Sequence, residues 1–194
     1  MAAQCPDLAV RTAPQARTLR RPADQPAARH RLKRRLTVIA PSLADVVLYA
    51  GGRLFDLITG GWDGVVLTAD HADPRPLRIL GARAFDLETA LAGPPAGRYL
   101  DAIMVEAHLY SSDARVRQMV YRARGEGLTD AMLWGDDWPA DLDAAAHPVR
   151  HRLSVAARAF KAHALAAAAV PADVSDIEVF RRSRITRPGS AYGL

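Results

Sequence analysis

The chain has 194 residues, of which 49% are hydrophobic, and its formal net charge is +5. This length and composition are typical of one globular domain with its own hydrophobic core. No apolar stretch is long enough to cross a bilayer, and residues 1–40 lack the apolar segment of a secretory signal. The single cysteine, Cys5, excludes an internal disulfide. These features predict a cytoplasmic protein with no membrane partner.

Basic residues are concentrated near the start of the chain. Residues 11–35 contain eight arginines and one lysine with almost no apolar periodicity, which is typical of a solvated arm. Such an arm suits nucleic acid or an acidic partner. No aromatic residue is interleaved to stack on bases, which argues against nucleic acid. We expect a disordered basic arm over 1–35, a folded domain over 36–180 and a basic tail over 181–194.

Apolar runs and helical periodicities alternate along the folded domain. Short β-branched runs predict strands, and apolar residues spaced by about 3.6 positions predict helices. In chain order we expect strand 36–40, helix 48–59, strand 64–69, helix 75–92, strand 99–107, helix 112–124, strand 128–134, an acidic loop over 136–146, helix 147–169 and strand 177–180. This alternation predicts an α/β protein with a mostly parallel sheet and helices on both faces.

Ligands of such proteins collect outside the carboxyl ends of the parallel strands. The rule points to the segments that follow the predicted strands, where polar side chains gather. The candidates for a pocket or ligand-binding role are Ser42, Asp45, Asp70, His71, His108, Ser111 and Asp113.

Several segments resemble one known family in the same order. The stretch "APSLADVVLYAGG" (40–52) is similar to the first motif of the PIG-L/LmbE-like zinc-dependent N-acetylglucosaminide deacetylases, which reads A-H-P-D-D-E before a Gly-Gly helix start. The stretches "GVVLTA" (64–69), "LDAIMVEAHLYSSDARVRQMVYRA" (100–123) and "AARAFKAHALA" (156–166) resemble later motifs, and residues 178–180 resemble a terminal Glu-x-Phe. The resemblance spans residues 36–180 and implies a Rossmann-like three-layer fold.

Most zinc ligands of the family are replaced by other residues in this sequence. Its first zinc-binding histidine falls on Ser42 and the histidine of its later H-P-D-H motif that also binds zinc falls on Ala114. Only Asp45 occupies a ligand position with a ligand residue. A catalytic zinc needs about three protein ligands and an open position for water. We therefore expect no cofactor and no metal at the positions of Ser42, Asp45 and Ala114.

The family's catalytic groups are missing as well. Its general-base aspartate falls on Ala44, and its transition-state-stabilising histidine falls on Ser111, while the acidic residue of the H-P-D-H motif is kept as Asp113. Without zinc nothing lowers the pKa of the attacking water, and without the base nothing accepts its proton. No catalysis is expected at Ala44 and Ser111 by the family mechanism.

The leading hypothesis is a catalytically degenerate homologue that acts as an accessory protein and binds a protein partner or a small molecule. The alanine-rich, lysine-poor composition indicates a GC-rich genome and favours a role in actinobacterial specialised metabolism. One alternative is a deacetylase, amidase or other enzyme whose zinc site is rebuilt from His71 or His108 beside Asp45. Another is a nucleic-acid-associated module that binds through the arm. A homo-oligomer stays open.

Overall fold

A computed structural model describes residues 33–70, 72–93, 101–125, 130–136 and 146–183. The sequence-based expectations for residues 1–32, for the segment 137–145 of the acidic loop and for the tail beyond 183 lie outside the described residues. No helix in the described part of the chain is both long and apolar enough to span a membrane.

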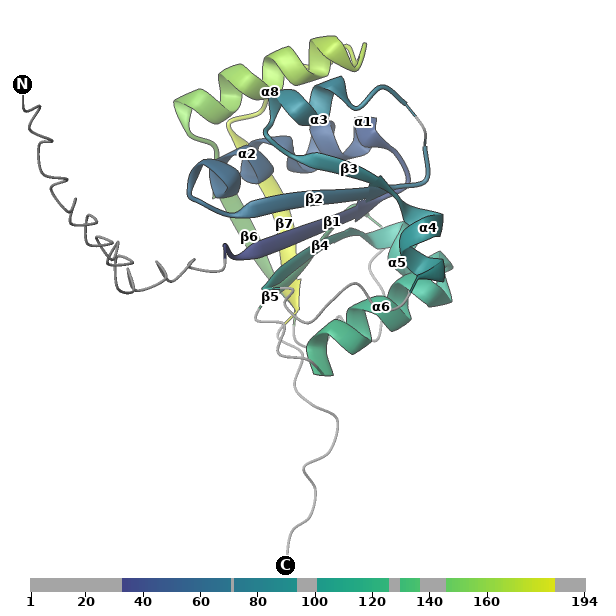
Figure 1. Ribbon diagram of the computed structural model, residues 1–194. Helices are drawn as coiled ribbons and strands as arrows, with labels where there is room; N and C mark the ends of the chain where they lie inside the picture. Colours follow the sequence, from purple (N-terminus) through teal and green to yellow (C-terminus); the bar gives the residue numbers. More distant parts are fainter. Residues whose placement is uncertain (1–32, 71, 94–100, 126–129, 137–145, 184–194) are drawn as a thin grey trace, which may run out of the picture. The chain divides into compact units, whose positions relative to one another are not determined.

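A seven-stranded sheet forms the centre of the domain, in the order β3-β2-β1-β4-β5-β7-β6 (Figure 1). Its strands are β1 (Arg35–Ala40), β2 (Asp63–Thr68), β3 (Arg83–Asp86), β4 (Ala102–Glu106), β5 (Asp130–Trp134), β6 (Ala146–Arg152) and β7 (Ile177–Ser183). The five strands from β3 to β5 pair in parallel, while β7 pairs antiparallel with both β5 and β6. The predicted mostly parallel α/β sheet is therefore confirmed.

Helices cover both faces of this sheet (Figure 1). They are α1 (Leu43–Asp45), the π-helical segment η1 (Val46–Ala50), α2 (Gly51–Thr59), α3 (Arg75–Ile79), α4 (Leu87–Ala92), α5 (Ala107–Ser112), α6 (Ala114–Gly125) and α8 (Val155–Ala167). Side chains that alternate along a strand face opposite layers. Accordingly Val38 belongs to the core under η1, α2, α3 and α8, whereas its neighbour Ile39 belongs to the core under α4, α5 and α6.

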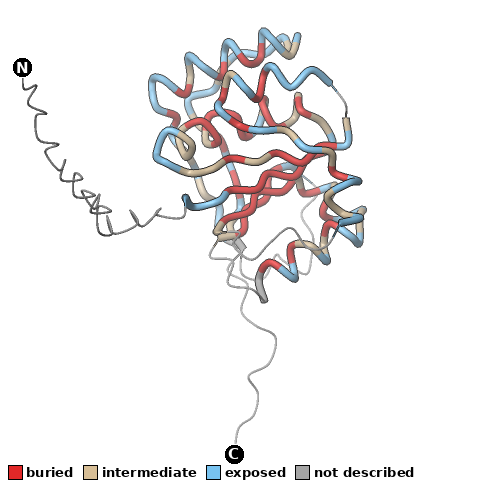
Figure 2. Tube along the Cα trace, in the orientation of Figure 1, coloured by how far each residue is buried: buried red, intermediate tan, exposed pale blue. Residues whose placement is uncertain are grey.

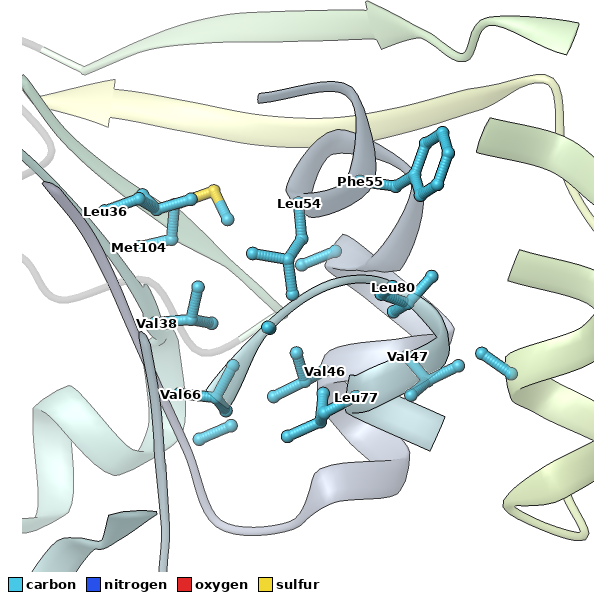
Figure 3. Close-up of a cluster of buried hydrophobic side chains, with 14 of the residues drawn as sticks. Leu36, Val38, Val46, Val47, Leu54, Phe55, Val66, Leu77, Leu80 and Met104 are labelled. Carbon is cyan, nitrogen blue, oxygen red and sulfur yellow. The ribbon is translucent and has the colours of Figure 1, made fainter. Parts of the chain in front are cut away.

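Burial follows this layering, because the central strands are buried while the outer sides of the helices are exposed (Figure 2). Figure 3 shows part of the larger core, in which Val38 and Val66 of the sheet face helical side chains such as Leu54 and Leu77. Apolar packing of this kind is the main source of stability in a domain of this size.

Two predicted helices begin at other residues than expected. Helical winding already starts after Ser42, whose Oγ accepts a hydrogen bond from Asp45 N at 3.1 Å, and not at residue 48. The expected cap at Ser112 is wrong, because a helix already begins after Glu106, whose carboxylate caps α5. Helix α6 then starts after Asp113, whose Oδ1 accepts a hydrogen bond from Arg115 N.

The predicted helix 75–92 is wrong over its centre. Helix α3 ends at Ile79, and Gly81 adopts a left-handed φ of +82°, which turns the chain into β3. Strand β3 pairs in parallel with β2, and α4 begins after it with Asp86 as its cap.

The predicted helix 147–169 is wrong in its first part. Residues 146–152 form β6, and α8 begins after Ser154, whose Oγ accepts from Ala157 N at 3.0 Å. Pro148 fits within β6 because this strand lies at the edge of the sheet, where a missing N–H leaves no neighbour unpaired. His147 and His151 are consequently strand residues and not neighbours on one helical face.

A buried ion pair joins α2, α8 and β7. Lys161 Nζ lies 2.6 Å from Glu178 Oε1 and also donates to the carbonyl oxygen of Leu48 at 2.7 Å. The carboxylate of Glu178 accepts hydrogen bonds from Gly52 N and Arg53 N, both at 2.8 Å. The lysine and the glutamate are only 2% and 4% exposed. The Glu178 carboxylate therefore caps the first turn of α2, where a negative charge is favoured.

Candidate functional site

The carboxyl ends of β1 and β2 lie next to each other, and this is where a ligand-binding crevice was expected. Ser42 follows β1, and its Oγ donates a hydrogen bond to Asp45 Oδ2 at 2.6 Å. Asp70 follows β2, and its Oδ2 accepts a hydrogen bond from Leu43 N at 2.9 Å. The other oxygen of this carboxylate, Oδ1, is buried and has no hydrogen-bond partner among the described residues. Ser42, Asp45 and Asp70 are thus gathered around α1, with Ala44 in the same short helix.

This arrangement holds the helix start in place and activates no nucleophile. The hydroxyl of Ser42 serves both as the cap of α1 and as a donor to Asp45, so the carboxylate and the hydroxyl satisfy each other. At the general-base position, Ala44 has no group that accepts a proton.

The segment after β4 carries the second group of candidates, and its acidic residue is bound elsewhere. Arg115 Nη2 lies 2.8 Å from Asp113 Oδ2, and the same guanidinium binds the Glu88 carboxylate of α4 at 2.7 and 2.9 Å. Hydrogen bonds from Arg115 hold the pKa of Asp113 below its usual value. Asp113 is therefore an ionised carboxylate in an ion-pair network with α4, and within the described residues no hydrogen bond joins it to Asp45.

The remaining candidates are dispersed. Ser111 is exposed, and its Oγ donates back to the carbonyl oxygen of Ala107 at 2.9 Å. His108 is exposed on α5, Ala114 opens α6, and His71 lies outside the described residues. Among the described residues, no three His, Cys, Asp or Glu side chains lie close enough together to hold a metal ion. The side chains at these positions do not fit a catalytic zinc, which requires about three ligands.

A Ser–Asp–His cluster that was not anticipated joins α2, β6 and the residue that caps α8. Asp56 of α2 accepts a hydrogen bond from Ser154 Oγ at 2.6 Å and lies 2.8 Å from His151 Nε2. Arg53 Nη1 lies 3.3 Å from His151 Nδ1. Because arginine only donates, Nδ1 accepts and Nε2 carries the proton that faces Asp56. The aspartate lies between the other two groups, so the serine has no histidine to take its proton. The cluster ties α2 to β6 and α8.

This cluster predicts an acid-sensitive contribution to stability. Burial raises the pKa of Asp56, but hydrogen bonds from Ser154 and His151 outweigh it and leave the pKa below its ordinary value of 3.8. A lowered pKa in the folded state stabilises the protein above the ordinary value, and this stabilisation is lost as the pH falls through the folded-state pKa. We expect Asp56→Asn to be destabilising near about pH 6 and to cost less near about pH 3. Urea unfolding at both pH values checks this, and an equal cost at both would contradict it.

Comparisons with known proteins bear on the fold. No family model matches the sequence, and no curated protein matches it significantly. Among solved structures, the antimicrobial A40926 pseudoaglycone deacetylase Dbv21 is similar with a TM-score of 0.50 and 15% identity, over 80% of this chain and 99% of that chain. A deacetylase–teicoplanin complex from the teicoplanin biosynthesis pathway is similar with a TM-score of 0.50 and 12% identity, over 78% and 98% of the two chains.

The fold is that of the PIG-L/LmbE-like deacetylases. The sequence resemblance is confirmed at this level, since the order of strands and helices in the described domain agrees with the Rossmann-like fold that it implied. At these identities the similarity concerns the PIG-L/LmbE-like fold alone, and function has to be argued from the side chains.

Proposed function

We propose that this chain is a PIG-L/LmbE-like protein without zinc-dependent hydrolase activity, which acts as an accessory protein and binds a small molecule or a protein partner. One observation carries the proposal. In the crevice where the fold family places its metal, Asp45 is bonded to Ser42, and the described residues supply no set of three ligands. With neither a metal-activated water nor a base at Ala44, deacetylation by the family mechanism has no route.

A buried hydrogen-bond acceptor near the expected crevice supports the idea that this chain keeps the fold in order to bind a ligand. Asp70 keeps a buried carboxylate oxygen without a hydrogen-bond partner among the described residues, an acceptor that still requires a donor. The two similar deacetylases act on an A40926 pseudoaglycone and in teicoplanin biosynthesis. We extend this to a role in specialised metabolism. The alanine-rich, lysine-poor composition, which indicates a GC-rich genome, is consistent with this role.

Zinc titration of the purified chain by isothermal calorimetry tests the proposal. We expect no saturable zinc binding by the wild type, and no difference between the wild type and Asp45→Asn, because one carboxylate is not a site. One-site binding that Asp45→Asn abolishes would show that histidines have rebuilt the metal centre, and the enzymatic alternative would then replace this proposal.

A further inference from the structure

A cavity of about 480 Å³ lies on the sheet face that carries α4 and α6. Its described walls come from β1, β2, β3, α4 and α6, and include Thr37, Val65 and Leu67 of the sheet. None of the crevice residues Ser42, Asp45 and Asp70 is part of this lining. The volume lies within the roughly 300–1,000 Å³ that is usual for small-molecule sites. The cavity is thus separate from the region around Ser42, Asp45 and Asp70.

The inner walls of the cavity are mainly apolar. Val65 and Leu67 rise from β2, Leu91 faces the space from α4, and Met119 and Ala123 do so from α6. Leu67 and Ala123 are buried, while Val65, Leu91 and Met119 are only partly covered. Partly exposed aliphatic groups around a concave surface favour the apolar body of a ligand, since its binding removes that surface from water.

Arginine is the commonest charged residue of the lining. Its charged members are four arginines, Arg35, Arg83, Arg115 and Arg122, and one carboxylate, Asp86.

These arginines differ in how many carboxylates already pair with them. Arg115 is held by the two carboxylates described above. Arg35 and Arg83 share the single carboxylate of Asp63, at 3.7 and 2.8 Å. Arg122 is exposed, and no ion pair is found for it within the described residues.

Asp86 is the carboxylate of the lining, and its Oδ1 accepts a hydrogen bond from Thr89 N at the start of α4. Arg122 is thus the arginine of the lining for which the described residues show no ion-pair partner, and it stands beside aliphatic walls. An arginine with free N–H groups binds a carboxylate through two parallel hydrogen bonds.

We propose that this cavity binds an amphipathic carboxylate, a medium-chain aliphatic acid, with its chain against Val65, Leu67 and Met119 and its carboxylate on Arg122. The site stands apart from the proposed function, because it shares no residue with the crevice and involves no metal.

The test is a fluorescence titration of the full chain with 11-(dansylamino)undecanoic acid, followed by displacement with dodecanoate or with dodecanol. We expect saturable binding and displacement by dodecanoate at roughly 10-fold lower concentration than by dodecanol, because only the acid gains the charge-assisted hydrogen bonds. Arg122→Gln should weaken dodecanoate binding roughly 10-fold and leave dodecanol unaffected.

Arg150→Gln is the matched control, since Arg150 is an exposed arginine on β6, outside the cavity lining. It should bind dodecanoate as the wild type does. Ala90→Phe, which places a ring in the cavity from α4, should abolish binding of both compounds. The proposal is overturned if the probe does not saturate, if Arg122→Gln and Arg150→Gln bind dodecanoate equally well, or if acid and alcohol displace the probe alike. The zinc titration is unaffected by each of these outcomes.

Discussion

Replacing Glu178 with alanine is expected to lower the free energy of unfolding by about 3–5 kcal/mol, the usual cost of removing one partner of a buried ion pair. The substitution leaves the ammonium group of Lys161 buried without its carboxylate. It also removes the acceptor for the backbone N–H groups of Gly52 and Arg53 at the start of α2. Urea denaturation measures the change, read from the midpoint at an unchanged slope.

Asp176→Ala provides a matched control. Asp176 also pairs with α8, with Arg158 Nη1 2.6 Å from its Oδ1, but both side chains are about half exposed, at 41% and 59%. Water screens this pair, so its loss should cost less than about 1 kcal/mol. The double variant Lys161→Met, Glu178→Leu should lose less stability than the sum of its single variants, because neither charge stays behind unpaired. Equal costs for Glu178→Ala and Asp176→Ala would show that the buried pair does not hold these elements together.

Gly52→Ala should be destabilising by about 1–3 kcal/mol, the range for overpacking a close-packed site. A Cβ at this position would collide with Cγ and Cδ2 of Leu153 and approach Glu178 Oε1 to 3.1 Å. Alanine is otherwise the better helix former by about 1 kcal/mol, so a loss of stability here has to come from the collision. Thermal unfolding of the variant measures it.

The neighbouring glycine is the control. At Gly51 an added Cβ would meet Leu80 Cδ1 at 3.3 Å, a contact that a small shift of the leucine relieves, so Gly51→Ala should change stability by less than about 1 kcal/mol. Shortening the obstructing side chain should also remove the effect. In a Leu153→Ala background, Gly52→Ala should cost nothing further. If Gly51→Ala is the more destabilising change, close packing between Gly52 and Leu153 does not explain why a glycine is needed at residue 52.

The sequence predicted the strands that lie inside the sheet and missed the two at its edges. β1, β2, β4 and β5 are buried on both faces, so they read as continuous apolar or β-branched runs. β3 and β6 are edge strands. β3 is short and half exposed, and leucines on both sides of it continue an apparent helical period. β6 contains Pro148 and charged residues, which edge strands tolerate and which hide a strand from a hydrophobic pattern.

From the sequence, only the position of the candidate site at the carboxyl ends of the strands could be predicted, and not the partners of its side chains. Because β1 and β2 are parallel neighbours, their carboxyl ends meet, and Ser42, Asp45 and Asp70 lie near one another around α1. Asp113 lies after β4, next to β1, yet it pairs with Arg115, which also binds Glu88, and this depends on side-chain directions that spacing does not reveal. The cavity under α4 and α6 combines side chains from five elements, and no local motif marks it.

The central proposal is that this chain has the fold of the PIG-L/LmbE-like deacetylases but lacks the zinc chemistry that the sequence resemblance implies for that family. Elemental mass spectrometry of the untagged protein after mild dialysis tests this most directly. The account predicts zinc far below one atom per chain, with no change in Asp45→Asn. Close to one zinc per chain, lost in Asp45→Asn, would contradict it and would make the crevice around Ser42, Asp45 and Asp70 an active metal centre.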